Sequence, residues 1–208
     1  MPHSSPTLDG RYVRLEPLEM GHVAALLEAA RGGTQLFHWT TVPDERAAME
    51  RYVETAVRAR EAGTALPFAT VRKTDARVVG ATRFFDMGRW AWPPAHPRSG
   101  GLDNCEIGYT WLSPAAIRSA VNSEAKYLML RHAFESWAVF AVCFHTDARN
   151  ERSCNALAGI GAKFEGILRA HRISADLLPR DSARYSITAA EWPAVSAHLL
   201  ARLAARSG

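Results

Sequence analysis

The chain has 208 residues, of which 48% are hydrophobic and 22% are charged, and its formal net charge is +4. This length and composition fit one domain over residues 1–208 with a sizeable buried core, and they exclude a disordered or fibrous protein. The small positive charge does not indicate nucleic-acid binding, because no basic block with interleaved aromatic residues stands out, and no nucleic-acid partner is expected.

The sequence favours a cytoplasmic protein without a membrane segment. The N-terminal stretch MPHSSPTLDG has no apolar signal core. No apolar run approaches the ~20 residues of a membrane helix. The cysteines Cys105, Cys143 and Cys154 form no CxxC pair, which indicates reduced thiols that are buried or half-buried. No His, Cys or acidic residues have metal-ligand spacing, so no metal site is expected.

Strands and helices alternate along the predicted chain. Strands are predicted at 11–18, 66–73, 77–87, 105–112, 142–147, 163–173 and 183–189. Helices are predicted at 19–31, 45–61, 123–139, 150–160 and 191–206. Asn150 would cap the fourth helix, and Gly161 would end it. Residues 88–104 carry too many Pro and Gly residues for a regular element and are predicted to form a long loop. The order predicts an α/β protein with a mixed sheet covered by helices.

The strand CEIGYTWL (105–112) places an acidic residue beside a glycine. Simple alternation would turn its odd-numbered residues to one face and its even-numbered residues to the other. Glu106 would then share a face with Gly108, whose missing side chain leaves room for a ligand.

The segment RSAVNSEAKYLML (118–130) begins with small polar residues and continues into an apolar helix. A helix start carries about four unpaired N–H groups and a partial positive charge, which suits a phosphate. Arg118 adds a guanidinium fork, whereas Ser119 and Asn122 would equally cap the helix without any ligand. The segment HTDARNERSCNALAGIGAKFEG (145–166) repeats the pattern of strand, capped helix and strand. Two neighbouring helix starts would then meet where α/β sheets usually bind ligands.

Nearly the whole chain, from LDGRYVRLEPL to EWPAVSAHLLARL, resembles the GCN5-related N-acetyltransferase (GNAT) superfamily. It is most similar to the RimJ/RimL-like branch, the ribosomal-protein N-terminal alanine and serine acetyltransferases. The segments that carry the resemblance are EIGYTWLSP, VNSEAKYLMLRHAFE, TDARNERSCNAL and YSITAAEWP. The resemblance implies an α/β (α+β) fold with a mixed, mostly antiparallel sheet, splayed central strands and flanking helices. It also implies an N-acetyltransferase that uses acetyl-CoA as co-substrate.

The resemblance implies that backbone amides of residues 117–123 hold the diphosphate of acetyl-CoA. The family pattern is Gln/Arg-x-x-Gly-x-Gly/Ala, from which Ile117, Ala120 and Asn122 depart. A positive φ would strain Ala120 more than a glycine, whereas Asn122 tolerates it. The residues expected to bind the co-substrate are Trp111, Leu112, Arg118, Ser119, Ala120, Val121, Asn122, Ser123, Asn150 and Ser153.

Acyl transfer to an amine needs an uncharged nitrogen, a stabilised oxyanion and a proton for the leaving thiolate. Glu106 is the expected base, directly or through water, and a strand glutamate paired with an arginine is the alternative. The resemblance implies that Asn150 contacts the pantetheine arm and that Ser153 protonates the thiolate. Pure helix capping is the alternative for Asn150. Leu157 stands where many relatives carry a tyrosine acid, and His145 is expected to be structural.

The expected acceptor is a primary amine, either a peptide N-terminus or a small molecule. Its predicted contacts are Phe37, His38 and Trp39 between the first two helices, together with Trp90 and Trp92 in the 88–104 loop. Alternatively, this loop packs its own tryptophans on the sheet. The alternative function is a non-catalytic acyl-CoA-binding sensor or partner module. The C-terminal helix would either form the contact of a homodimer or pack on its own domain, and the sequence does not decide between the two.

Overall fold

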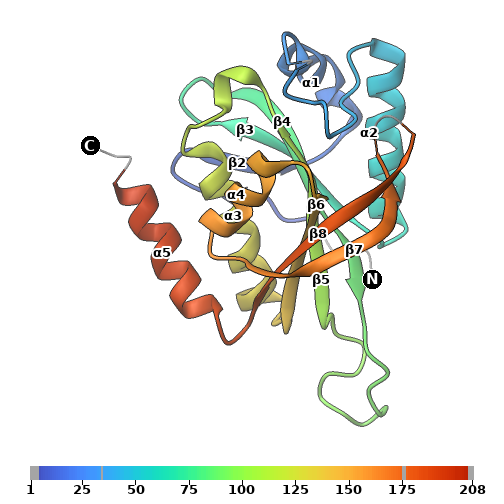
Figure 1. The fold of residues 1–208 in the computed structure, drawn as a ribbon, viewed down its shortest axis with the longest axis vertical. Helices are drawn as coiled ribbons and strands as arrows, with labels where there is room; N and C mark the ends of the chain where they lie inside the picture. Colours follow the sequence, from blue (N-terminus) through green and yellow to red (C-terminus); the bar gives the residue numbers. More distant parts are fainter. Residues whose placement is uncertain (1–4, 34, 175–176, 206–208) are drawn as a thin grey trace.

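The computed structural model describes residues 5–33, 35–174 and 177–205. Its strands are β1 (Leu8–Asp9), β2 (Val13–Pro17), β3 (Leu66–Arg72), β4 (Arg77–Gly88), β5 (Asn104–Leu112), β6 (Ala141–Asp147), β7 (Lys163–Ile173) and β8 (Pro179–Thr188). They form one sheet in the order β1-β2-β3-β4-β5-β6-β8-β7 (Figure 1). Strands β5 and β6 run parallel, and the other neighbouring pairs run antiparallel. This is the mixed, mostly antiparallel sheet that the sequence predicts.

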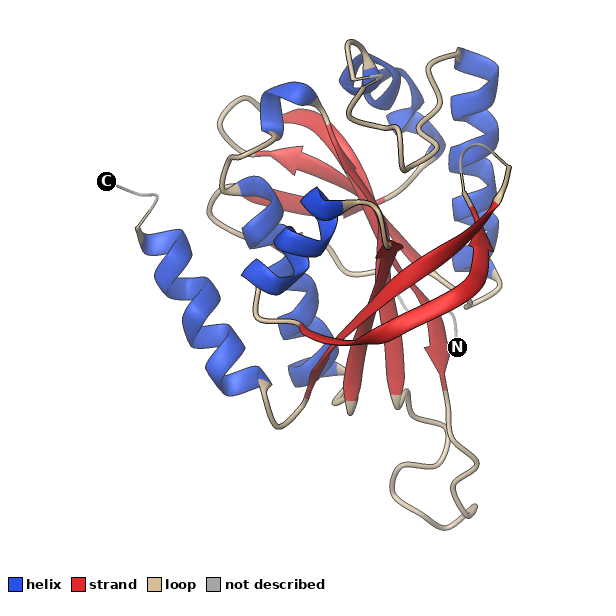
Figure 2. Ribbon diagram, viewed as in Figure 1, coloured by secondary structure: helices blue, strands red, loops and turns tan. Residues whose placement is uncertain are grey.

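Helices flank the sheet (Figure 2). They are α1 (Val23–Ala30), α2 (Arg46–Glu61), α3 (Val121–Arg131), α4 (Glu151–Gly159) and α5 (Trp192–Ala204). Helices α1 and α2 contact β4 and β3, whereas α3 contacts α5 and β2. Short turns of 3-10 helix occupy Met20–His22 and Pro114–Ala116, and a π-helical turn occupies His132–Ser136. Within the described residues, no helix has the length and apolar character needed to cross a membrane.

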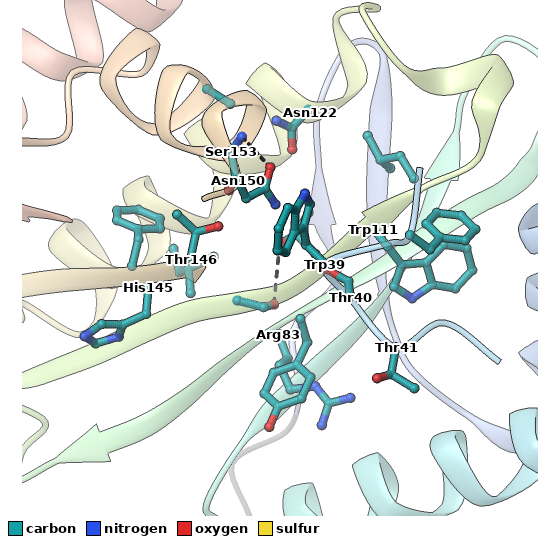
Figure 3. A pocket seen from close by; sticks show the side chains of 18 of the residues that line it. Trp39, Thr40, Thr41, Arg83, Trp111, Asn122, His145, Thr146, Asn150 and Ser153 are labelled. Atoms are coloured by element: carbon teal, nitrogen blue, oxygen red, sulfur yellow. Dashed lines mark hydrogen bonds between the residues drawn. The ribbon is translucent and has the colours of Figure 1, made fainter. Parts of the chain in front are cut away.

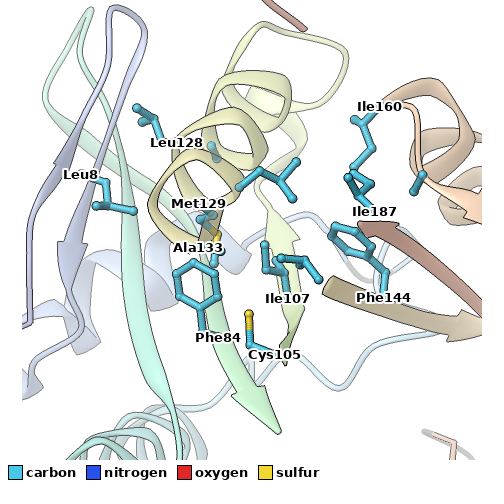
Figure 4. Packing of buried hydrophobic residues seen from close by; sticks show 14 of the residues in the cluster. Leu8, Phe84, Cys105, Ile107, Leu128, Met129, Ala133, Phe144, Ile160 and Ile187 are labelled. Atoms are coloured by element: carbon cyan, nitrogen blue, oxygen red, sulfur yellow. The ribbon is translucent and has the colours of Figure 1, made fainter. Parts of the chain in front are cut away.

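Two hydrophobic clusters fix the helices on opposite faces of the sheet. The larger lies on the α3 and α5 side and includes Phe84, Met129 and Phe144 (Figure 4). The smaller lies under α1 and α2 and includes Leu26 and Met49. Burial of such side chains is worth about 1.5–3 kcal/mol each, so the apolar stripes of the helices determine which face they cover.

Local signals in the sequence explain most of the element boundaries. The Asn150 side chain accepts a hydrogen bond from the backbone of Ser153 at the start of α4, and Gly161 adopts a φ of 91° just beyond its end. This left-handed conformation suits glycine. The helix predicted over 123–139 is shorter in the structure, because α3 passes into the π-helical turn after Arg131. Strand β1 is an addition that the sequence does not predict.

Strand β5 contains a β-bulge that overturns the predicted alternation. Gly108 pairs with Arg83 and Trp111 pairs with Ala81, so two residues of β5 lie between the pairs where β4 has one. Tyr109, inside the bulge, has a φ of 50°. The extra residue reverses the facing of the side chains. Ile107 therefore packs in the larger cluster and Trp111 in the smaller one, while Tyr109 is 48% exposed. The prediction that these three residues share a face is wrong.

Strands β5 and β6 separate at the centre of the sheet. Their parallel pairing runs from Asn104 opposite Ala141 to Glu106 opposite Cys143 and stops there. Strand β6 goes on pairing with β8 as far as Asp147. The two central strands are therefore splayed beyond Glu106, as expected, and the site described next lies at this opening.

Candidate active site

The opening between the splayed strands leads into a cavity of about 950 Å³. This volume lies within the ~300–1,000 Å³ of typical ligand and cofactor sites. Its walls come from the connection between α1 and α2, from α2, β4, β5 and β6, from the start of α3, and from α4, β7 and β8. Figure 3 shows Asn122, Asn150 and Ser153 at one end of the cavity and Arg83 and Thr41 at the other.

The turn before α3 supplies one end of the cavity. Arg118, Ser119, Asn122 and Ser123 line it. The left-handed residue of the turn is Arg118, with a φ of 61°, whereas Ala120 has a φ of −69° at the helix start. The strain expected at Ala120 therefore does not arise.

Hydrogen bonds hold this turn in place and leave one polar atom without a partner. The Ser119 hydroxyl donates to the carbonyl of Ala116 at 2.6 Å and accepts from the Val121 backbone at 3.2 Å. The N-cap residue of α3 is Ala120, so Ser119 braces the turn from one residue before the cap position. Asn122 Oδ1 is buried and has no hydrogen-bond partner among the described residues. A buried acceptor without a partner is rare in folded proteins and marks a place for a ligand or water. The cavity lining includes neither Ala120 nor Val121 within the described chain.

The start of α4 lies on the same side of the cavity. Asn150 Oδ1 accepts a hydrogen bond from the Ser153 backbone at 3.1 Å, which is the predicted helix cap. Asn150, Ser153 and Leu157 all line the cavity. The cap uses only the amide oxygen of Asn150, so capping and contact with a ligand through the amide nitrogen are compatible. The helix starts of α3 and α4 both border the cavity, as the repeated strand-helix pattern predicts.

Glu106 lies where the central strands separate, and its side chain lines the cavity. Glu106 is 3% exposed. Its Oε2 atom is 2.9 Å from Arg172 Nη2 on β7 and 2.9 Å from His145 Nδ1 on β6. The paired glutamate that the sequence offered as an alternative thus exists in the structure. The pairing leaves the carboxylate at the cavity wall, so the pairing does not exclude proton transfer.

His145 is closer to the centre of the site than the sequence suggests. It lines the cavity, and its ring lies 4.8 Å from that of His171 on β7. Burial, together with His145 and Arg172, lowers the pKa of His171. The position of His145 follows from the strand register. Cys143 is the β6 partner of Glu106, and His145, two residues later, lies on the same face of β6 as Cys143.

Lys126 is a further lining residue, and no motif in the sequence marks it. It projects from α3, is 6% exposed and donates a hydrogen bond to Thr110 Oγ1 at 2.7 Å. Burial lowers its pKa to about 7. No ion pair of Lys126 occurs among the described residues.

Aromatic residues of the connection between α1 and α2 form another wall of the cavity. Phe37 and Trp39 line it, as predicted for the acceptor side. His38 is not part of the lining and packs edge-on against Trp39. Trp111 and Leu112 line the cavity from β5, and the Trp111 ring packs against Phe37 with centroids 5.7 Å apart.

Trp90 and Trp92 were predicted to contact the acceptor, but they lie outside the cavity lining. Figure 1 shows the loop between β4 and β5 projecting from the sheet at the end away from α1 and α4. Buried Asp103 accepts hydrogen bonds from the Trp90 backbone and from Trp92 Nε1, at 2.6 and 2.9 Å. The Trp90 ring stacks on Phe140 at 5.2 Å. The loop therefore packs its own tryptophans, as in the alternative interpretation.

A metal cluster is not among the features of this site. Within residues 5–33, 35–174 and 177–205, no group of three His, Cys, Asp or Glu side chains is arranged to hold a metal ion. The titratable groups Glu106, His145 and Lys126 line the cavity, and His171 packs against His145. These groups can move protons and hold charge, which suits transfer of an acyl group between two organic substrates.

Comparisons with known proteins identify the family. The sequence profile of the acetyltransferase (GNAT) domain matches residues 13–163. The comparison with curated proteins found no match. Among solved structures, a GCN5-related N-acetyltransferase from Brucella melitensis is 28% identical, with a TM-score of 0.83 over 98% of this chain and 87% of that chain. A protein from T. thermophilus, described as a candidate acetyltransferase, is 35% identical, with a TM-score of 0.76 over 95% and 96% of the two chains.

A third structure has a similar fold at lower sequence identity. It is Mycobacterium smegmatis RimJ in complex with CoA-disulfide, which is 21% identical, with a TM-score of 0.78 over 96% of this chain and 95% of that chain. The profile covers more than half of the chain, and the site lies where the central strands of the sheet separate. The chain belongs to the GNAT family of N-acetyltransferases.

Proposed function

We propose that this protein transfers an acetyl group from acetyl-CoA to a primary amine, and that a protein N-terminal amine is the first acceptor to test. The observation that carries the proposal is the position of Glu106, a buried carboxylate at the point where β5 and β6 separate into a cavity. Proteins of similar fold add support. M. smegmatis RimJ and a RimL ribosomal L7/L12 acetyltransferase were solved with CoA in disulfide form. A Vibrio fischeri relative is a ribosomal-protein-S5-alanine acetyltransferase.

The residues present fit acetyl-CoA at the α3 and α4 end of the cavity. The turn at 118–123 offers backbone amides and the small Ser119 and Ser123 side chains to the diphosphate, and Arg118 adds a cation. Asn122 Oδ1, which has no hydrogen-bond partner among the described residues, would be a further polar contact. Asn150 would hold the pantetheine arm through its amide nitrogen, which the helix cap leaves unused.

Glu106 would take a proton from the amine, directly or through water, as the nitrogen bonds to the acetyl carbon. Backbone amides of β5 beyond Glu106, which no longer pair with β6, would polarise the thioester carbonyl. The carbon–sulfur bond then breaks, and Ser153 or water supplies a proton to the thiolate. One amine and one acetyl-CoA thus give one N-acetyl amide and one free thiol. A positioned acid or base contributes roughly 100- to 10,000-fold to such a step.

The first test is calorimetric titration of the purified protein with acetyl-CoA, with free CoA, ATP and NAD as controls. We expect micromolar binding of the two CoA compounds and none of ATP or NAD. Thiol release in the presence of peptides with free and with blocked N-termini then tests the acceptor. Absence of CoA binding would refute the proposal, and binding without thiol release for any amine would favour the sensor alternative.

A further inference from the structure

The charges that line the cavity are unbalanced. Eight Arg and Lys residues belong to the described lining, whereas Glu106 is its acidic residue. Acetyl-CoA carries several negative charges, and it would neutralise the cations near its proposed end, on the turn before α3 and on α4. Figure 3 shows Arg83 at the opposite end of the cavity, away from the residues proposed to hold the co-substrate. The positive charge of Arg83 is therefore not explained by binding of acetyl-CoA at the other end.

Arg83 is a buried guanidinium group held by aromatic rings. It projects from β4, is 8% exposed and lines the cavity. Its guanidinium carbon lies 4.0 Å from the ring centroid of Tyr109 and 5.4 Å from that of Tyr52. Within the described residues its guanidinium group makes no hydrogen bond and no ion pair. A buried charge without a partner is costly, and cation–π contacts offset only part of that cost.

The β-bulge in β5 creates this arrangement. Arg83 pairs with Gly108 across the two strands, where no side chain covers it. The left-handed backbone of Tyr109 turns its ring outward, so that it lies against the guanidinium group instead of in the core. Bulges commonly re-aim side chains next to active sites. The guanidinium group thus lies against the Tyr109 ring and lines the cavity.

Arg180 is a second cation of the lining, and the charges of Asp147 and Glu106 act on it without a direct ion pair within the described residues. It lies directly opposite Arg172 in the pairing of β7 with β8, an arrangement in which like charges repel. Arg172 has carboxylate partners in Glu106 and Asp86. Arg180 has no ion pair among the described residues, and its Nε atom is buried without a hydrogen bond.

We propose that the acceptor is a primary amine that also carries a carboxylate or phosphate group, and that Arg83, assisted by Arg180, binds this anion. The inference rests on the proposed acetyl transfer. Phe85 is the β4 partner of Glu106 and lies two residues from Arg83, a separation of about 7 Å along the strand. An amine near Glu106 and an anion near Arg83 can therefore belong to one small molecule or to an acidic N-terminal residue of a peptide. The planar fork of Arg83 suits both carboxylate and phosphate.

Two matched pairs of probes separate the possible sources of the anion. One pair is phosphoethanolamine and ethanolamine, and the other is a tetrapeptide amide that begins with Glu and its counterpart that begins with Gln. Binding is measured by calorimetry on the protein saturated with CoA, and turnover by thiol release from acetyl-CoA. We expect the anionic member of at least one pair to bind and react about 10- to 100-fold better, as a charge-assisted hydrogen bond allows.

The substitution Arg83→Met tests the assignment, with Arg77→Met on the same strand as control. The Arg77 side chain is 79% exposed at the start of β4, outside the cavity lining. Arg83→Met removes a buried charge and keeps an unbranched apolar stem, so we expect a folded protein with unchanged acetyl-CoA affinity. It should abolish the preference for the anionic probes, whereas Arg77→Met should retain it.

The outcomes distinguish this inference from the proposed function. Equal binding of the charged and neutral probes, or a preference that survives Arg83→Met, would overturn the anion site. Discrimination in binding without thiol release from any amine would uphold the anion site and refute acetyl transfer. Efficient turnover of the neutral amines, without preference for the anionic probes, would uphold acetyl transfer and refute the anion site.

Discussion

His145 Nδ1 lies 2.9 Å from Glu106 Oε2, although the two residues lie on strands that stop pairing at Glu106. The contact crosses the opening between β5 and β6, and both side chains are more than nine-tenths buried. Arg172 reaches the same carboxylate oxygen from β7. Side chains from three strands thus meet at one oxygen atom. Glu106 is therefore held in one orientation at the cavity wall.

The first prediction concerns Glu106→Gln. The amide keeps the size and shape of the carboxylate but cannot accept a proton from the amine. We expect turnover at saturating acetyl-CoA and acceptor to fall by roughly 100- to 10,000-fold, with little change in the Kd for acetyl-CoA. Thiol-release kinetics and calorimetric titration measure the two quantities.

The control for this variant is Asp86→Asn. Asp86 is the other carboxylate partner of Arg172, and its side chain is 65% exposed. Its φ of 45° suits Asn as well as Asp. This variant should turn over close to the wild-type rate. Equal rates for Glu106→Gln and the wild type at several pH values would remove Glu106 as the base.

The sequence predicts the order of elements well because apolar periodicity and capping residues are local signals. Asn150 and Gly161 mark the ends of α4 in the structure as they do in the sequence. The splayed strands follow from the family resemblance. The bulge at Tyr109 is different, because it depends on the register with β4. No local pattern in CEIGYTWL shows that one residue is extra.

The candidate site is predictable where it depends on contiguous residues and is missed where it depends on pairing. The turn at 118–123 and the start of α4 are contiguous, and both border the cavity. The contact of Glu106 with His145 and Arg172 joins segments that are distant in sequence. Trp90 and Trp92 are the reverse case, because the sequence predicted them in the site and the structure places them outside the cavity lining. Their aromatic character suggested a ligand wall, but Asp103 anchors them in their own loop.

A second prediction separates the two roles of Asn150. Asn150→Asp keeps a side-chain oxygen to cap α4 but replaces the amide donor with a negative charge. We expect near wild-type stability and at least tenfold weaker binding of acetyl-CoA. Asn150→Ala should lose both properties, with the free energy of unfolding lower by about 0.5–2 kcal/mol. Urea unfolding and calorimetry measure them. Unchanged acetyl-CoA affinity in Asn150→Asp would leave Asn150 with the capping role alone.

A third prediction concerns Glu124, which fixes the start of α3 to the N-terminal strands. Its carboxylate accepts hydrogen bonds from the backbone of Arg11, Tyr12 and Val13 at 2.8, 2.6 and 2.7 Å. Glu124→Ala would leave these N–H groups without their acceptor. Val13 is buried, whereas Tyr12 is half-buried and Arg11 is exposed. An unsatisfied buried group costs about 1–3 kcal/mol and the other two cost less, so we expect the free energy of unfolding to fall by roughly 2–4 kcal/mol in urea denaturation.

The control is Glu54→Ala on α2, whose side chain is 50% exposed and pairs with Arg58. Such surface pairs contribute little, and we expect a change of less than about 1 kcal/mol. Gly10→Ala tests the same junction from the other side, because an added Cβ atom would lie 2.5 Å from Glu124 Cδ. It should also destabilise the fold. Equal stability of Glu124→Ala and Glu54→Ala would show that water satisfies the three amides.

The fourth prediction concerns the buried Lys126 and the pH dependence of stability. Burial lowers its pKa from 10.5 to about 7. Between these two pH values the unfolded chain holds a proton on Lys126 that the folded chain releases. The contribution of Lys126 to the free energy of unfolding therefore rises with pH across this window. Below pH 7 the full penalty remains, on the order of 4–5 kcal/mol for a shift of this size.

Lys126→Met removes the buried charge and should raise the free energy of unfolding at pH 6.5 by roughly 2–4 kcal/mol. The stability gap between this variant and the wild type should then shrink by about 3 kcal/mol at pH 9.5, because the wild-type lysine is neutral there in the folded chain. Lys163→Met is the control, since the Lys163 side chain is 74% exposed. Urea denaturation at both pH values measures the gaps. A gap that does not change with pH would mean that Lys126 stays charged in the fold, held by water in the cavity.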